Sequence, residues 1–279
     1  MKKWKIILTI IAVVAIVTAL ILRFELITMG TPSGKLTFTS EGSAYVYDLD
    51  INKLEKIAVD GYDSVFCISG SNYEISSFYC LARKDDDFFA LHIDKGEVVS
   101  KIELTSEPKT AKFVKNRLII GFGNEIKYLS SVNDELKPLT DKIGASQILP
   151  SGYNSILWND TSYRICVRKD GKMNVGEAKR LERKFIPVAY DNSAITVYDP
   201  NEQKIYFIDA ETCEISTAKD NLSGTCPIVT CGEYVISKDI SGNSENRRLW
   251  LTDTENGTVR AAKFDNILMK AANVEWITE

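Results

Sequence analysis

Residues suited to acid–base or metal chemistry are sparse in this chain and are not grouped. His92 is the single histidine, so a zinc site built from several histidines is excluded, and a Ser-His-Asp arrangement would have to use this residue. No Gly-x-Ser-x-Gly elbow, phosphate-binding glycine loop or Cys-x-x-Cys pair occurs. His92 stands between Leu91 and Ile93 in an alternating segment, which favours a strand residue on a polar face over a catalytic base. We therefore expect no metal and no cofactor.

The densest acidic run is Asp85-Asp86-Asp87. Carboxylates grouped in this way can hold calcium, whereas a charge run between two strands usually faces water. The Asp-box of the sialidases, Ser-x-Asp-x-Gly-x-Thr-Trp, has no copy here. A solvated loop between two strands is the favoured interpretation of this run. A calcium loop stays open as the alternative.

Six cysteines could form disulfides or pack as small apolar side chains. Cys67 and Cys80 lie on neighbouring predicted strands and are symmetric about the turn between them, so they are expected to face each other across a hairpin. Cys226 and Cys231 would point to opposite faces of one strand, which makes Cys213 the better partner for Cys226. Two disulfides and six buried thiols are the alternatives.

A short pattern returns six times after residue 40 and predicts the fold. Each copy is an apolar run that leads into a turn, and the steps between equivalent positions are 46, 36, 38, 41 and 44 residues. The equivalent positions are Asp48, Asp94, Ser130, Arg168, Asp209 and Asp253. A period of about 40 residues built from short alternating strands is typical of a β-propeller with one four-stranded blade per repeat. The sequence thus predicts an all-β, six-bladed β-propeller in which helices are rare.

The aspartates at the ends of these runs have a structural explanation. Asp48, Asp209 and Asp253 stand where the chain leaves a strand, and an aspartate there can accept hydrogen bonds from backbone amides two residues further on. We expect them to shape turns and not to bind a metal.

The two ends of the repeat region complement each other. The first repeat begins near Leu36-Thr37-Phe38 and supplies only three strand segments before Gly61, so its innermost strand is missing. At the other end, the segment from Ala272 to Ile277 reads as a strand without a blade. Pairing the N- and C-terminal strands would complete the first blade and close the ring, which removes the exposed sheet edges of an open array.

Residues 1–23 predict one N-terminal transmembrane helix that anchors the chain. Three lysines precede seventeen apolar or weakly polar residues, 6–22, and Arg23 follows them. As a helix this stretch would be about 25 Å long, close to the lower limit for crossing a hydrocarbon core. A cleaved signal peptide, cut after Val17-Thr18-Ala19, is the alternative, but it would leave apolar residues exposed at the new terminus. An uncleaved signal anchor is therefore favoured.

The charges around this span predict location and partners. Basic residues before it keep the N-terminus in the cytoplasm, so residues 24–33 would form a linker and residues 34–279 a propeller outside the cytoplasm. Without the three lysines, the remaining 31 of 34 basic side chains stand against 38 acidic ones, a net charge of −7. Such a surface repels polyphosphate, so we expect a single-pass protein of the cell membrane with no nucleic-acid partner.

Three of the repeated segments resemble a known superfamily. Tyr45-Val46-Tyr47-Asp48, Ile205-Tyr206-Phe207-Ile208-Asp209 and Leu249-Trp250-Leu251-Thr252-Asp253 look like the third blade strand of propellers in the TolB and YVTN-repeat, WD40-like group. The resemblance covers residues 34 to 279 and reaches no specific family, because the Ser-Pro-Asp-Gly turn of TolB blades and the Trp-Asp and paired-Gly marks of the WD40 and kelch groups are absent. It implies an extracytoplasmic binding platform for a protein, peptide or glycan.

Ligand recognition is expected at the rim where second-to-third strand turns and inter-blade loops gather, because loops on a rigid scaffold carry function. Candidate residues in these predicted loops are Tyr62, Asp85, Asp87, Trp158, Asn159, Asp199, Asn201 and Asp239. The leading hypothesis is a binding, sensing or scaffold module. The alternative is an enzyme that acts on a glycan or lactone, and it requires two carboxylates within about 10 Å of each other over a pocket at the channel mouth.

Overall fold

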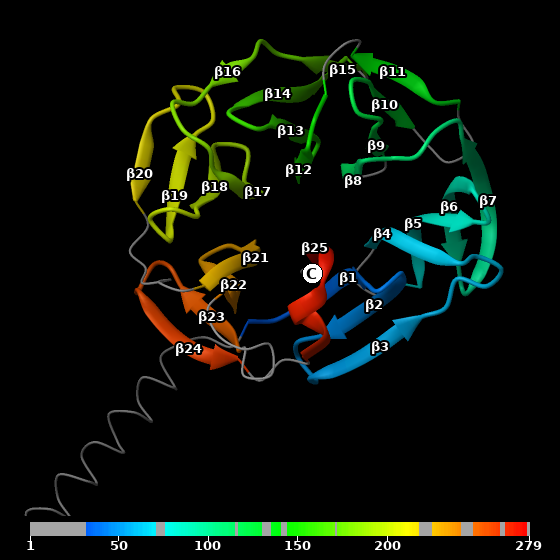
Figure 1. Ribbon diagram of the computed structural model, residues 1–279, viewed down its shortest axis with the longest axis horizontal. Helices are drawn as coiled ribbons and strands as arrows, with labels where there is room; N and C mark the ends of the chain where they lie inside the picture. The colour runs from blue at the N-terminus through cyan, green and yellow to red at the C-terminus, as the bar shows by residue number, and fades with distance from the viewer. Residues whose placement is uncertain are drawn as a thin grey trace, which may run out of the picture. The chain divides into compact units, whose positions relative to one another are not determined.

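Six small antiparallel sheets surround a central axis in the computed structural model (Figure 1). The structure describes residues 32–70, 76–114, 117–129, 135–140, 144–170, 172–217, 225–240, 248–262 and 266–277. Each sheet is one blade whose first strand lies at the centre of the ring. This confirms the predicted all-β, six-bladed propeller.

In each of the first three blades, four strands follow one another from the centre outward. Blade 1 contains β25 (Ala272–Ile277), β1 (Lys35–Ser40), β2 (Ser43–Asp48) and β3 (Lys53–Ile57). Blade 2 contains β4 (Ser64–Gly70), β5 (Ser77–Lys84), β6 (Asp87–Asp94) and β7 (Glu97–Leu104). Blade 3 contains β8 (Thr110–Val114), β9 (Arg117–Gly121), β10 (Ile126–Leu129) and β11 (Lys137–Thr140).

The other three blades follow the same plan. Blade 4 contains β12 (Gln147–Ser151), β13 (Asn154–Asn159), β14 (Ser162–Lys169) and β15 (Lys172–Val175), and β16 (Lys179–Arg180) pairs with β14 beyond the end of β15. Blade 5 contains β17 (Ile186–Tyr190), β18 (Ala194–Asp199), β19 (Lys204–Asp209) and β20 (Ile215–Thr217). Blade 6 contains β21 (Thr225–Cys231), β22 (Tyr234–Asp239), β23 (Leu249–Asp253) and β24 (Thr258–Ala262).

Blade 1 is built from both ends of the repeat region, as the sequence predicts. β25 pairs antiparallel with β1, with Leu36 opposite Trp276 and Thr37 opposite Glu275. The indole Nε1 of Trp276 also donates a hydrogen bond to the Ser33 carbonyl oxygen over 2.9 Å. On its other side β25 contacts β21 of blade 6, so the C-terminal strand closes the ring.

The core lies between neighbouring blades, so several strands nearer the axis, such as β1 and β9, are buried on both faces. β1 and β9 therefore read as nearly continuous apolar or small-residue runs, because a strand covered on both faces has no reason to alternate. Separate clusters of buried side chains fill the junctions of blades 1 and 2, 2 and 3, 3 and 4, 4 and 5, and 5 and 6. These wedges of apolar atoms hold the blades at fixed angles around the axis.

Helix is almost absent from the part of the chain that the structure describes. One 3₁₀ segment, η2 (Asn266–Lys270), leads into β25. No helix of those residues is long and apolar enough to span a membrane. The predicted anchor, residues 6–22, lies outside the described residues, as does nearly all of the linker 24–33.

The repeated aspartates form the turns expected of them. The Oδ1 atom of Asp48 accepts hydrogen bonds from the amides of Asp50 and Ile51 over 3.0 and 3.2 Å. Asp209 and Asp253 repeat this geometry with the amides two and three residues further on, over 2.7 to 3.0 Å. The backbone hydrogen bond from Thr212 lowers the pKa of Asp209. Each of these third-to-fourth strand turns is thus locked by its own aspartate.

Replacing Gly34 by alanine is expected to destabilise the fold more than the same change at Gly61. Both glycines have positive φ, 110° and 82°, so alanine costs about 1 to 2 kcal/mol at either site. At Gly34 the added Cβ would also lie 2.5 Å from the carbonyl oxygen of Ile277, whereas nothing lies within 4 Å of one at Gly61. Urea unfolding should show the larger loss for Gly34→Ala. Equal losses would mean that the contact with β25 does not limit ring closure.

Candidate functional site

The innermost strands enclose two adjoining cavities along the axis. The first strand of every blade runs from one face of the ring to the other, and antiparallel pairing returns each second-to-third strand turn to the face where it began. We call this the upper face and the opposite one the lower face. The upper cavity has a volume of about 350 Å³ and the lower cavity about 210 Å³. Both are lined by β8, β12, β17, β21 and β25.

β-Bulges in the inner strands shape this channel. The pairing register shifts by one residue at Phe66 in β4, at Val188 in β17 and at Ile228 in β21, and a further shift occurs between β25 and β1. A bulge turns one side chain away from the strand's regular alternation. Val188 and Ile228 line the upper cavity, and Val188 and Val274 border both cavities. The bulges therefore supply an apolar waist between the two.

The charged groups of the channel are unevenly placed. Lys109 and Lys112 line the upper cavity, and Glu275 lines the lower one. The Nζ atom of Lys109 lies 2.6 Å from Oε2 of Glu107, and both side chains are about 60% exposed. Lys112 is half-buried and borders both cavities. Neutral polar side chains of Thr110, Ser146, Gln147 and Asn273 complete the polar wall of the upper cavity.

Four of the eight predicted rim residues are exposed on the upper face. Asp85 and Asp87 flank the turn between β5 and β6, Asn159 ends β13, and Asn201 lies in the turn between β18 and β19. These positions all belong to second-to-third strand turns, so the ring places them on one face around the upper cavity. Their role in binding remains a prediction.

Of the other four predicted rim residues, two are buried and two are half-buried. Trp158 and Asp199 are each 1% exposed, so the expectation that they offer a surface to a ligand is wrong. Trp158 stacks on Tyr163 in the core between blades 4 and 5, with ring centroids 5.8 Å apart. Oδ1 of Asp199 accepts hydrogen bonds from two backbone amides of its own turn. Its Oδ2 atom forms an ion pair with NH1 of Arg183, 2.9 Å away. Burial at the ends of these strands overrides the loop position that the sequence suggests.

Tyr62 and Asp239 are half-buried. Tyr62 meets Phe89 edge to face, with centroids 5.6 Å apart, and burial raises the pKa of its hydroxyl. The carboxylate of Asp239 accepts hydrogen bonds from Trp250 Nε1 over 2.5 Å and from the Arg248 amide over 2.8 Å. Both side chains brace their blades and present only part of their surface at the rim.

The predicted Cys67–Cys80 disulfide is not formed, and all six cysteines are free. The bulge at Phe66 shifts the pairing of β4 with β5, so Cys67 lies opposite Leu81. Cys80 consequently lies opposite Ile68. The two thiols point to opposite faces of blade 2, one into the core shared with blade 3 and the other into the core shared with blade 1.

Cys213 and Cys226 are separated in the same way by blade 5. Cys213 packs against the core between blades 4 and 5, and Cys226 packs against the core between blades 5 and 6. The thiol of Cys213 lies 3.3 Å from the Tyr163 hydroxyl. A disulfide between residues on the two sides of one sheet cannot form, so the predicted pairing is wrong.

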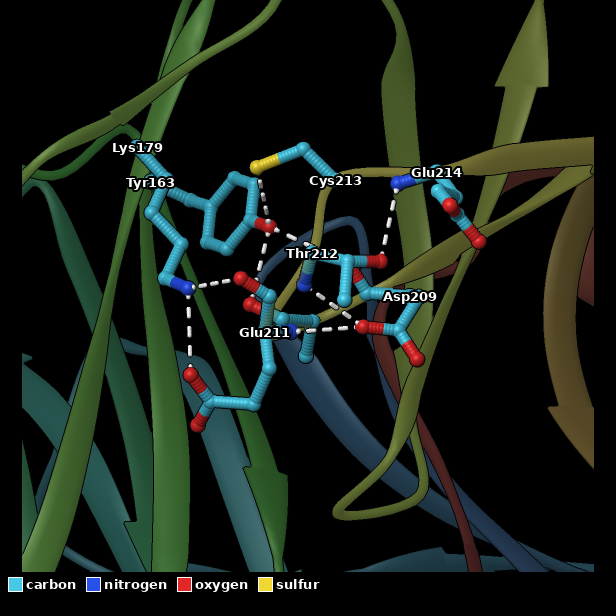
Figure 2. Close-up of polar contacts among 8 residues, drawn as sticks. Tyr163, Lys179, Asp209, Glu211, Thr212, Cys213 and Glu214 are labelled. Carbon is cyan, nitrogen blue, oxygen red and sulfur yellow. Dashed lines mark hydrogen bonds and ion pairs between the residues drawn. The ribbon is translucent and has the colours of Figure 1, made fainter.

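The contacts around Cys213 join blade 4 to blade 5 and are not signalled by the sequence (Figure 2). The Tyr163 hydroxyl donates to the Ala210 carbonyl oxygen over 3.0 Å, and burial raises its pKa. Beside it, Nζ of Lys179 lies 3.1 Å from Oε2 of Glu211 and also donates to the Glu211 carbonyl oxygen (Figure 2). This cluster fixes the turn that Asp209 shapes, and it has the character of a structural joint.

The remaining chemistry-bearing groups are single. His92 lies on β6, stacked on Tyr79 at 4.3 Å, with Nε2 2.8 Å from the Ser77 hydroxyl. No group of three or more His, Cys, Asp or Glu side chains able to hold a metal occurs within the described ranges. The upper cavity, with its surrounding turns, is therefore the candidate functional site.

Comparison with known proteins gives the fold alone. No family model matches the chain, and no curated protein matches it. A chain of a nidogen/laminin complex aligns with a TM-score of 0.57 at 10% identity, over 86% of this chain and 97% of that one. TolB from Acinetobacter baumannii aligns with a TM-score of 0.53 at 13% identity, over 88% and 67%. The propeller domain of the trilobed protease from Pyrococcus furiosus, described as having an open velcro topology, aligns with a TM-score of 0.53 at 11% identity, over 80% and 74%.

Stability is expected to fall as the pH rises from about 9 to about 11. Burial raises the pKa of Cys67 and of Cys166 to about 11, against 9.0 for an unperturbed thiol. The unfolded chain therefore loses thiol protons at lower pH than the folded chain, and each thiol removes up to about 2 to 3 kcal/mol of unfolding free energy over this range. Urea unfolding between pH 8 and 11 measures the slope. A Cys67→Ala/Cys166→Ala variant should show a shallower slope, and an unchanged slope would contradict the assignment.

Asp199→Asn is expected to destabilise the protein by about 1 to 3 kcal/mol, because it removes the negative charge that faces Arg183 in a buried turn. The matched change Asp87→Asn, at an exposed turn of the same face, should alter the unfolding free energy by less than about 0.5 kcal/mol. Urea unfolding of both variants makes the comparison. A loss at Asp199 no greater than that at Asp87 would mean that the ion pair with Arg183 contributes little to stability.

Proposed function

We propose that the propeller is a binding, sensing or scaffold module that recognises a protein, peptide or glycan at its upper face. The observation that carries this proposal is the open upper cavity surrounded on one face by exposed polar turn residues, among them Asp85, Asp87 and Asn201. A preformed concave site with a few polar groups on a rigid scaffold is the usual form of a recognition surface.

Each face has polar turn residues that bind their own turn and others that are exposed. On the lower face, Asp48, Asp209 and Asp253 each spend one carboxylate oxygen on two backbone amides of their own turn. On the upper face, Asp85, Asp87 and Asn201 project from turns as exposed side chains. The exposed side chains of the upper face surround the larger of the two cavities, about 350 Å³ against 210 Å³, which favours that face as the recognition surface.

Propellers of the same fold support a macromolecular partner. One of the similar chains belongs to a nidogen/laminin complex, in which a propeller takes part in a protein assembly. The alternative, an enzyme acting on a glycan or lactone, needs two carboxylates over the pocket. Of the channel-lining residues that the structure describes, Glu275 is the one carboxylate, and it lines the lower cavity. Binding is therefore the better supported function.

The attachment point of the N-terminal segment suggests how such a module is presented. Lys35 begins β1 opposite Asp48 and Ile277, at the lower face. If residues 6–22 hold the chain in the cell membrane with the N-terminus in the cytoplasm, the tether joins the propeller at this face. Lys35 and the upper cavity lie at opposite faces of the ring, so the point where the chain enters the propeller does not block the cavity.

Removing the exposed upper-face side chains is expected to abolish partner capture. The full chain is purified in detergent and biotinylated. It is used to capture partners from a membrane extract by crosslinking and, in a second assay, is applied to a glycan array. The variant Asp85→Ala/Asp87→Ala/Asn201→Ala is tested alongside it in both. Recognition at this face predicts at least about a tenfold lower yield of the captured partner with the variant, because a few central residues carry most of the binding energy.

The matched control is Glu214→Ala/Glu255→Ala, two exposed glutamates beside third-to-fourth strand turns of the lower face. It should capture the partner as well as the unaltered chain. Equal capture by the unaltered chain and the upper-face variant, or loss with the lower-face control alone, would place recognition elsewhere. Hydrolysis of an array glycan would instead favour the enzyme.

A further inference from the structure

Lys112 is the unusual residue of the channel. It lies on β8, where strand alternation sends its neighbour Ala111 into the core between blades 2 and 3 and leaves Lys112 in the channel wall. Its side chain is half-buried, and no hydrogen bond or ion pair joins it to another residue that the structure describes. A partly desolvated ammonium group without a counter-charge is unfavourable, and an anion beside it would relieve that cost.

The rest of the upper cavity suits an anion that also forms hydrogen bonds. The Gln147 side chain is exposed at the start of β12, and the Asn273 side chain stands on β25 across the channel, where one N–H of its amide donates to the Phe66 carbonyl oxygen. Hydroxyl groups of Thr110 and Ser146 lie in the same wall, and the Ser146 hydroxyl donates to the Trp158 carbonyl oxygen over 3.2 Å. The Gln147 amide and the second N–H of Asn273 are then the neutral donors that, with the Lys112 ammonium group, can satisfy both oxygens of a carboxylate.

The charge balance favours a singly charged group over phosphate. Lys109 already faces Glu107 at 2.6 Å, whereas Lys112 borders the lower cavity with Glu275 but forms no ion pair with another described residue, so Lys112 is the lysine left to bind an anion in the upper cavity. A phosphate group carries nearly two charges at neutral pH and is usually held by two or more cations. The acidic surface of the protein further disfavours polyanions.

The shape of the channel gives the direction of entry. Lys112, Ile148, Val188 and Val274 border both cavities, so an apolar waist lies at the level of the ammonium group. Below it, Glu275 places a negative charge in the lower cavity. An anion is therefore attracted from the upper face and opposed from the lower one.

We propose that the upper cavity is a carboxylate site, in which the Lys112 ammonium group pairs with a carboxylate of the ligand and Gln147 and Asn273 bond to its polar groups. The proposal rests on recognition at the upper face and deepens it. The carboxylate belongs either to a small free acid or to the C-terminus of a partner polypeptide that enters the cavity.

The test uses calorimetric titration of the full chain in detergent with glutarate, with the peptide Gly-Gly-Ala-Ala ending in a free carboxylate, with the same peptide amidated, and with inorganic phosphate. Lys112→Gln keeps the length and polarity of the side chain and removes its charge. It should weaken binding of the carboxylate probe by about tenfold or more, because a charge-assisted hydrogen bond is lost. Lys112→Arg should retain most of the affinity, and the control Lys172→Gln, on exposed β15, should retain all of it.

The probes separate the two sources of the carboxylate. Binding of glutarate but not of the peptide identifies a free acid, and binding of the free peptide but not of its amide identifies a chain terminus. Tighter binding of phosphate than of either, no binding of any probe, or equal binding by Lys112→Gln would overturn the proposal. If Lys112→Gln fails to fold, Gln147→Ala serves instead, with about a threefold or greater loss expected for one neutral hydrogen bond.

The two sets of variants separate the carboxylate site from recognition at the upper face as a whole. A partner that the Asp85→Ala/Asp87→Ala/Asn201→Ala variant loses but the Lys112→Gln variant retains would leave the rim as the recognition surface and remove the carboxylate site alone.

Discussion

Pairing of β25 with β1 is the interaction on which the rest of the structure depends. It joins residues more than two hundred positions apart, and Trp276 fastens it further by bonding to Ser33 at the point where the chain enters the propeller. Without β25, blade 1 would lack its inner strand and both cavities would lose one wall, which includes Asn273, Val274 and Glu275. The candidate site therefore exists only in the closed ring. Its geometry is a property of the whole chain and not of any one repeat.

The inner strands meet two demands at once. The second strand of each blade requires regular antiparallel pairing with the inner strand. The narrow space at the axis requires inner-strand side chains that fill or line a channel. Bulges at Phe66, Val188 and Ile228 reconcile these demands, because each inserts one residue that leaves the ladder and permits a local change of direction. The same bulges alter every pairing beyond them by one position. A geometric need at the axis thus determines which side chains meet several residues away, as the separation of Cys67 from Cys80 shows.

The sequence predicts the blades well because their cause is local and repeated. Short apolar runs bounded by turns give the six sheets, and the unmatched strands at the two ends give the closure. The sequence predicts the site less well, because contacts with other blades determine which side chains are exposed, and bulges determine the pairing register of the strands. Trp158 and Asp199 look like loop residues by position, yet the junction with blade 5 and the contact with Arg183 bury them. Lys112 reads as an ordinary polar residue of an alternating strand, and only the ring shows that its side of the strand faces the axis and not solvent.

The rigid ring and the lightly charged channel lower the free-energy cost of binding a ligand at the axis. Apolar clusters between blades hold the inner strands in place before any ligand arrives, so little ordering free energy opposes binding. Beside Lys109 and Lys112, the described wall of the upper cavity offers amides and hydroxyls. Groups of that kind orient and discriminate but do not exchange protons near neutral pH. With Asp85 and Asp87 outside and Lys112 within, the same face repels polyanions at its rim, whereas a single negative charge could still be accepted at its centre.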